Sequence, residues 1–262
     1  MIRVGIGGWT YEPWRGTFYP AGLKQADELS YASRHLTTIE INGTFYRTQS
    51  ATSFKKWRDE TPEDFVFSVK GHRAIVNSKK LADAGEPLDW FFKSGILELG
   101  EKLGPVLWQL APFKKFDAAD LGGFLNLLPK AAGGRTLMHA LEVRHKSFLD
   151  PAFIALVREH NVAVVYADSN EHPAIADVTA DFVYARLQRT TDAEETGYSK
   201  SDLKRWAACA RIWEAGGVPE DLPHVAEAVV TKTKRPVFVY MISGAKVRAP
   251  AAGMALLEQL KR

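Results

Sequence analysis

The stretch that decides the fold is MHALEVR, Met138–Arg144, an apolar run whose final positions carry charge. Side chains along a strand alternate between two faces, so Leu141 and Val143 share one face while Glu142 and Arg144 share the other. One continuously apolar face is typical of a barrel strand whose outside is covered by helices. The stretch therefore predicts a buried strand that delivers Glu142 and Arg144 to a polar site at its end.

Seven further segments have strand-like composition, and helix-like segments separate most of them. One helix is predicted from Asp150 as N-cap and Pro151 to Asn161, and another from Ser201 as N-cap to Gly216. Alternation of strand and helix favours parallel pairing, and eight such units suit a single closed (β/α)8 TIM-type barrel spanning residues 1–262. An open doubly wound sheet is the alternative. The predicted strands are Arg3–Gly7, Thr37–Asn42, Phe65–Lys70, Pro105–Leu110, Met138–Arg144, Val162–Asp168, Phe182–Gln188 and Pro236–Ile242.

Composition excludes several classes of protein. Hydrophobic residues at 46% and charged residues at 25% of 262 are ordinary globular values, so a disordered or fibrous chain is not indicated. The net charge of +3 is not gathered into a basic tail, which disfavours nucleic-acid binding. Cys209 is the only cysteine, so no disulfide or cysteine-based metal site is expected. The N-terminus lacks a signal-peptide pattern and no apolar run could span a bilayer, so we expect a cytoplasmic protein with no membrane partner.

Polar residues fall on the same face of six predicted strands, near the end of each strand. That face should point along the barrel axis, because the apolar face packs under the helices. The polar ends then meet at the C-terminal mouth, where barrel enzymes place their sites. An alternative is that these acids and bases only neutralise one another, but burying such a network contributes little stability. The predicted inward set is Glu40, Asn42, Lys70, Gln109, Glu142, Arg144, Asp168 and Arg186.

Motifs along nearly the whole chain resemble those of the YecE-like family, domain of unknown function 72. They include GGWTYEPWRGTFYP, IEINGTFYR, VFSVKGHR, WQLAPFKKF and ALEVRHKSF. The resemblance implies a TIM-type barrel and adds Tyr46 to the site positions, but it implies no reaction. Two strand ends depart from the family pattern, which tends to show His-Gly and Phe-Asn-Asn there. This chain instead has Gln188 and Arg189 at the first, and Met241, Ile242 and Ser243 at the second.

The residue types at the mouth favour an anionic ligand. Lys70, Arg144 and Arg186 are three cations aimed at one point, and arginine offers a fork for phosphate or carboxylate. We predict an enzyme, a hydrolase or lyase, that acts on a small phosphorylated or nucleotide-like molecule. Glu142, Glu40 or Asp168 would do acid–base work, and Lys70 would act as a catalytic amine if desolvated. The predicted substrate-binding residues are Arg144, Arg186, Asn42, Tyr46, Gln109, Trp9 and Tyr11.

Other chemistries stay open at this point. Glu40 and Glu142 could act as the carboxylate pair of a glycoside hydrolase, with the aromatic residues of the first loop on a sugar ring. A nucleic-acid-binding or endonuclease-like barrel is a second alternative. Few histidines converge, since His145 faces away from Glu142, so no metal and no cofactor are predicted. A single weakly held Mg²⁺ on Glu40, Glu142 or Asp168 is the remaining metal option.

Overall fold

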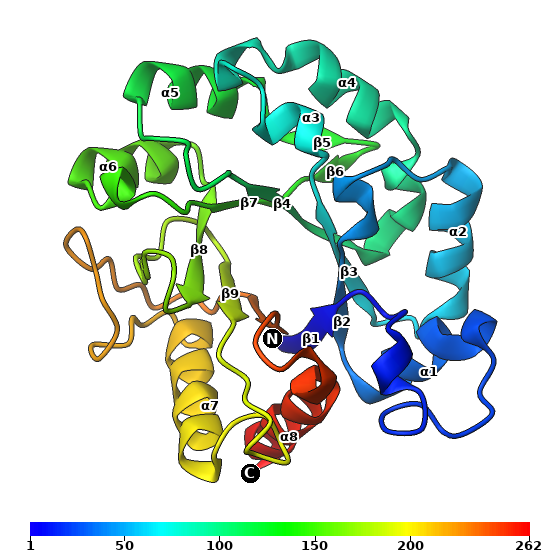
Figure 1. Cartoon of the computed structure of the whole chain (residues 1–262). Coiled ribbons are helices and arrows are strands. Elements are labelled where there is room, and N and C mark those ends of the chain that lie inside the picture. The colour runs from blue at the N-terminus through cyan, green and yellow to red at the C-terminus, as the bar shows by residue number, and fades with distance from the viewer.

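A computed structural model describes residues 1–262, and its centre is a closed barrel of eight parallel strands (Figure 1). Around the barrel the strands follow the order β1-β10-β9-β8-β7-β4-β3-β2, so the first and last strands of the chain pair with each other. The predicted (β/α)8 TIM-type barrel is confirmed, and every predicted strand is found within two residues of its expected ends. The strands are β1 Ile2–Gly7, β2 Thr38–Ile41, β3 Val66–Lys70, β4 Leu103–Gln109, β7 His139–Glu142, β8 Ala163–Asp168, β9 Val183–Leu187 and β10 Val237–Met241.

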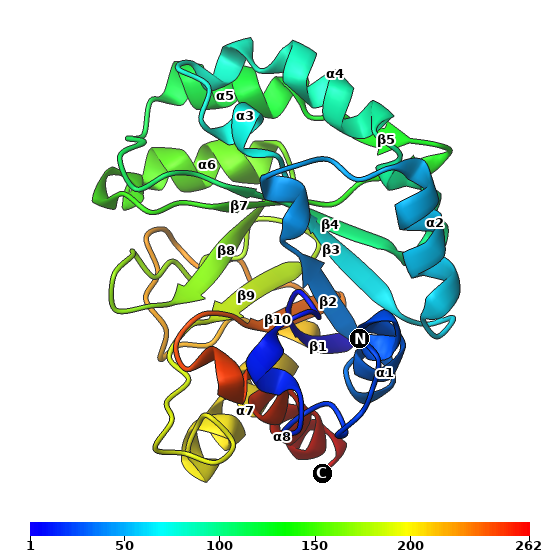
Figure 2. The same ribbon diagram turned by 45° about the vertical axis from the view of Figure 1, so that its right-hand side comes forward.

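Helices surround the strands in both views (Figures 1 and 2). They are α1 Glu28–His35, α2 Ala51–Glu60, α3 Arg73–Val76, α4 Gly85–Lys93, α5 Ala118–Leu127, α6 Pro151–Glu159, α7 Lys200–Glu214 and α8 Ala249–Lys261. A small hairpin, β5 Ala131–Ala132 with β6 Arg135–Thr136, follows α5. The two predicted helices are present as α6 and α7. In α6, the Asp150 carboxylate accepts the N–H of Ala152, as an N-cap should.

Two local expectations are corrected. Ser199, and not Ser201, caps α7, because its hydroxyl accepts the N–H of Asp202. No α-helix lies between β8 and β9, although strict alternation predicts one there. Helix α7 covers this part of the barrel instead, since Tyr166 of β8 packs against Trp206 at 5.8 Å and Trp213 at 5.9 Å.

Two cores hold the fold together. The larger cluster has 59 buried residues between the strands and the helices, whereas the cluster inside the barrel has only 8, so most apolar burial is outside the barrel. The inner cluster consists of Leu107, Ala140, Ala163, Val165, Phe182, Tyr184, Phe238 and Tyr240. These side chains fill the barrel interior toward the N-terminal ends of the strands. The layer at the C-terminal ends is therefore left to polar groups.

The segments that follow the strands surround the C-terminal end of the barrel, which is called its mouth below. Short 3-10 helices at Gly43–Phe45, Lys146–Phe148 and Lys246–Arg248 come shortly after β2, β7 and β10. They bring side chains far apart in the sequence to one mouth. None of the helices combines the length and the apolar character needed to cross a bilayer.

Candidate functional site

A cavity of about 580 Å³ opens at the C-terminal mouth of the barrel. It is lined by both strand ends and loops, as expected for a TIM-type barrel. Of the predicted site residues, it brings together Trp9, Asn42, Tyr46, Lys70, Gln109, Arg144 and Arg186. Residues of the atypical eighth strand end also line it, namely Met241, Ile242 and Ser243.

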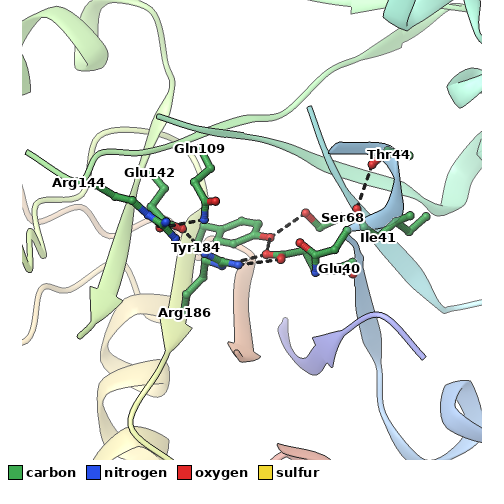
Figure 3. A network of polar contacts seen from close by, with 10 residues as sticks. Glu40, Ile41, Thr44, Ser68, Gln109, Glu142, Arg144, Tyr184 and Arg186 are labelled. Atoms are coloured by element: carbon green, nitrogen blue, oxygen red, sulfur yellow. Dashed lines mark hydrogen bonds and ion pairs between the residues drawn. The ribbon is translucent and has the colours of Figure 1, made fainter. Parts of the chain in front are cut away.

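Arg186 of β9 lies at the centre of the site, between two carboxylates (Figure 3). Its Nε and Nη2 donate to the Glu40 carboxylate at 3.1 and 3.0 Å. Its Nη1 donates to the Glu142 carboxylate on the opposite side. Both glutamates have no exposed surface, and Arg186, which lines the cavity, is 3% exposed, so this ion network forms the floor of the cavity.

Glu142 of β7 is also bound by two neighbours on its own side. The Arg144 Nε donates to it at 2.8 Å and the Gln109 Nε2 at 3.0 Å (Figure 3). Burial alone would raise the pKa of Glu142, but the Arg186 and Arg144 guanidiniums outweigh burial and bring that pKa down to about 2. The two carboxylates in turn outweigh the effect of burial on Arg186 and raise its pKa. Glu142 is therefore a carboxylate, and Arg186 a cation, at any physiological pH.

Hydroxyl groups of the barrel interior contact Glu40 on the side away from the mouth. The Tyr184 hydroxyl donates to the Glu40 carboxylate at 2.6 Å and lies 2.8 Å from the Ser68 hydroxyl (Figure 3). Burial and then the charge of Glu40 raise the pKa of Tyr184, which therefore stays protonated. Tyr184 lies two residues before Arg186 on the inner face of β9, but it was not among the predicted site residues.

Two lysines of the mouth have no carboxylate partner. The Lys70 Nζ forms no hydrogen bond or ion pair and lies 4.5 Å from the centre of the Phe45 ring. Burial first, and then the positive charge of Arg186, lower the pKa of Lys70 to about 8. Lys246, in the 3-10 helix after β10, lies 4.2 Å from the Tyr11 ring, and burial lowers its pKa. Since Glu40 and Glu142 balance Arg144 and Arg186, these lysines give the mouth an excess of positive charge.

Aromatic side chains form one wall of the cavity. Trp9 lines it and packs edge to face against Trp57 at 5.0 Å, while Tyr46 is 68% exposed at the rim. Tyr11, which was predicted to bind substrate, is not among the residues that line the cavity. Its ring packs against Trp14 at 5.2 Å and lies beside Lys246. Tyr11 therefore supports the loop from behind.

The predicted inward orientation of Asp168 is wrong. In β8 the inner positions are held by the small residues Ala163 and Val165, whereas Asp168 pairs in register with Leu187, which belongs to the outer core. The Asp168 carboxylate forms an ion pair with Arg189 at 2.6 Å. Arg189 is one of the positions at which the chain departs from the family pattern. The structure therefore gives Asp168 a charge partner outside the cavity.

Histidines near the mouth have local structural roles. The His145 Nδ1 accepts the N–H of Ser147 and the His72 Nδ1 accepts that of Ala74, so each caps a short helix. The orientation predicted for His145, away from Glu142, agrees with this contact. No three His, Cys, Asp or Glu side chains converge in a way that could hold a metal ion.

Loop residues of the site were missed by sequence reasoning. Lys246, Trp57 and Gln49 line the cavity but belong to helices or loops, where no strand alternation indicates direction. The available signal was position alone, because segments that follow strands gather at the mouth of a barrel.

A closed parallel barrel with a polar, cation-rich C-terminal mouth defines a TIM-type barrel protein. Residues 3–262 match the family model described as "Protein of unknown function DUF72". The chain belongs to this family, as its motifs indicate.

Named relatives and solved structures agree with that assignment. The chain is 29% identical over 161 residues to the UPF0759 protein YunF of Bacillus subtilis, covering 58% of this chain and 54% of YunF. It is 28% identical over 149 residues to the UPF0759 protein YecE of Escherichia coli K12, covering 56% of this chain and 50% of YecE. The matched part thus spans about half the length of these relatives.

Two crystal structures of DUF72 proteins have the same fold. The protein from Thermotoga maritima has a TM-score of 0.76 at 21% identity, with 100% of both chains covered. A protein from Enterococcus faecalis has a TM-score of 0.72 at 17% identity, covering 100% of this chain and 96% of that one. At these identities the likeness supports the barrel and says nothing about the reaction.

Proposed function

We propose that this barrel is an enzyme that binds a small anionic molecule, one that carries a phosphate or carboxylate group, at its C-terminal mouth. The observation that carries the proposal is the excess of positive charge around the cavity. Lys70 and Lys246 face it without carboxylate partners, beside Arg144, whose side chain is 23% exposed. An anion is the ligand that such a charge distribution stabilises.

The buried ion network at the floor of the cavity supports the same proposal. A buried ion network contributes little to stability, because desolvation of the charges offsets their attraction. Here Glu40 and Glu142 hold Arg186 from both sides, and Glu142 also fixes the Nε of Arg144. This leaves the remaining donors of Arg144 oriented before any ligand arrives, which is the arrangement that favours binding.

Lys70 is the group we assign to proton transfer. Glu40, Glu142 and Asp168 were the sequence-based candidates. The two glutamates have no exposed surface and already accept hydrogen bonds from arginine, and Asp168 lies outside the cavity, paired with Arg189. A lysine whose pKa is about 8 can exchange a proton near neutral pH. Since no Asp or Glu lines the cavity to activate water there, we favour a lyase over a hydrolase, and a glycoside hydrolase has no support.

Ligand-induced thermal stabilisation tests the anion site. A panel of phosphate, phosphosugars, nucleotides and dicarboxylates should contain a ligand that stabilises the wild type. At about a hundred times its dissociation constant, that ligand should add roughly 2.7 kcal/mol. For a chain of this size the melting temperature would rise by about 5–10 °C.

Arg144→Met should abolish that shift, because it removes the oriented guanidinium while keeping much of the side-chain bulk. Arg211→Met, on the exposed outer surface of α7, is the matched control and should respond like the wild type. Chloride at equal ionic strength separates specific binding from screening. If nothing in the panel shifts the wild type, or if Arg144→Met responds equally, the mouth is not an anion site.

A further inference from the structure

Lys70 combines a fixed position with a free amine. It is the last residue of β3, and the Thr44 hydroxyl donates to its backbone carbonyl at 2.6 Å. The N–H of the next residue, Gly71, donates to Leu107 of β4 at 2.8 Å. The side chain lines the cavity, and its Nζ has no hydrogen-bond acceptor. The amine is therefore held at the cavity wall with its lone pair available whenever it is deprotonated.

We propose that Lys70 is a covalent nucleophile that forms a Schiff base with an anionic carbonyl compound, namely a ketone or aldehyde carrying phosphate or carboxylate. The proposal rests on the anion site proposed above and names the substrate class of that site. Oriented cations at the mouth would hold the anionic group, while Lys70 meets the carbonyl carbon.

The step balances without a cofactor. The lone pair of the neutral Lys70 Nζ attacks the carbonyl carbon, and the carbonyl π electrons move to the oxygen, which takes up one of the two amine protons. The resulting carbinolamine keeps one N–H and loses its hydroxyl group, which leaves as water with one proton from solvent, so a protonated C=N bond replaces the C=O bond. The protonated imine withdraws electrons from the neighbouring carbon, which is the chemistry of a lysine-dependent lyase.

The surroundings of Lys70 favour its neutral form. Burial and the like charges of Arg186 and Arg144 oppose protonation, while Glu40 and Glu142 favour it but are bound to arginine. With a pKa of about 8, roughly a tenth of the amine is neutral at pH 7, against well under a thousandth for an ordinary lysine. Nucleophilic lysines of enzymes are activated in this way.

Lys246 is the competing amine of the same mouth. It also lines the cavity, but it lies in the 3-10 helix after β10 and its Nζ is 4.2 and 5.6 Å from the Tyr11 and Trp14 rings. Aromatic faces stabilise an ammonium, so the two rings oppose its deprotonation. Lys70 has one such ring and, in addition, two guanidiniums close by.

Borohydride trapping with peptide mapping tests the proposal. The full-length protein is incubated with dihydroxyacetone phosphate or with pyruvate and reduced with sodium borohydride. Reduction of the imine adds two hydrogens, so the trapped peptide gains the mass of the probe minus one oxygen atom. We expect this adduct on Lys70 with at least one probe, at more than ten times the yield on any other lysine. Glycerol 3-phosphate and lactate, which have the same anionic groups but no carbonyl, should give none.

Variants and pH complete the test. Lys70→Arg, which keeps the charge but cannot form the imine, should lose the adduct, and Lys204→Met, at an exposed position of α7 outside the cavity, should keep it. Between pH 6 and 7 the initial trapping rate should rise roughly ninefold, and it should level off above about pH 9, following the neutral amine. Adduct spread evenly over surface lysines, or equal labelling of Lys70→Arg, would overturn the proposal.

Thermal melts with the same four compounds separate the two proposals. If both members of a pair raise the melting temperature and neither keto compound labels Lys70, the anion site stands and the Schiff base is wrong. If no compound in the panel of either experiment shifts the melting temperature, the anion site itself fails. Labelling of Lys70 without any shift by the carbonyl-free analogues would support the nucleophile and contradict anion recognition.

Discussion

Replacing Lys70 by methionine should stabilise the protein at neutral pH. A lysine pKa lowered from 10.5 to about 8 means that the folded state disfavours the ammonium by ~3 kcal/mol, at 1.36 kcal/mol per pKa. Methionine removes the charged end and keeps the aliphatic stem, and no hydrogen bond is lost because the Lys70 Nζ makes none. Losing the contact with the Phe45 ring costs about 0.5–1 kcal/mol, so the expected net gain is about 2–3 kcal/mol at pH 7.

The gain should depend on pH with a defined sign. Below about pH 8 the amine is protonated in the folded and the unfolded chain, so the wild type carries the full penalty. Between about 8 and 10.5 only the unfolded chain stays protonated, so the stability of the wild type rises with pH. The advantage of Lys70→Met should therefore shrink, with the ionic part falling to about 1.4 kcal/mol at pH 9.5.

Urea denaturation of both proteins from pH 7 to 9.5 measures this difference. Lys204→Met, at an exposed position of α7, is the control and should stay within about 0.5 kcal/mol of the wild type. A Lys70→Met protein that is less stable than the wild type at pH 7 would refute the reasoning. So would a gain that does not change with pH, since that would trace to packing and not to the buried charge.

Two further substitutions test the network and the barrel. Arg186→Met should lower the free energy of unfolding by about 3–5 kcal/mol, because Glu40 and Glu142 lose their shared cation while fully buried. Adding Glu142→Gln should recover part of this loss, and a loss below 1 kcal/mol in urea titrations of Arg186→Met would contradict the reasoning. Gly5→Ala should prevent normal closure of β1 on β2, because the new Cβ would lie 1.9 Å from the Thr38 carbonyl oxygen. Circular dichroism melts should show a large loss of stability, and an unchanged melting temperature would mean that the strand spacing is wrong.

The strands of the barrel could be predicted because apolar runs and turn residues set their limits locally. Alternation of polar and apolar residues also oriented Glu40, Glu142 and Arg186 correctly. Each of their strands has an apolar outer face, so the charged residue must lie on the inner face. It failed for Asp168, because β8 is apolar on both faces and alternation cannot say which face is inside. Tyr166, on the same face as Asp168, does not decide the question, since a tyrosine suits a helix-covered face as well as a polar mouth; here it packs against α7.

The partners within the site could not be predicted from periodicity. That Arg186 takes both glutamates depends on how strands from opposite sides of the barrel meet across its axis. That Lys70 has no carboxylate partner depends on the same geometry, because the sequence predicted equal numbers of acidic and basic residues, three of each, at the mouth. With Asp168 outside the cavity and paired with Arg189, the balance at the mouth shifts toward positive charge.

The most direct test of the anion site is a crystal structure grown with tungstate, a heavy analogue of phosphate whose position anomalous scattering reveals. We predict one strong anomalous peak in the cavity of the C-terminal mouth, within hydrogen-bond distance of Arg144 and of Lys70 or Lys246. The peak should be absent from crystals of Arg144→Met prepared in the same way. Tungstate found only on surface lysines, or a cavity without a peak at millimolar tungstate, would contradict the proposal that this mouth binds an anion.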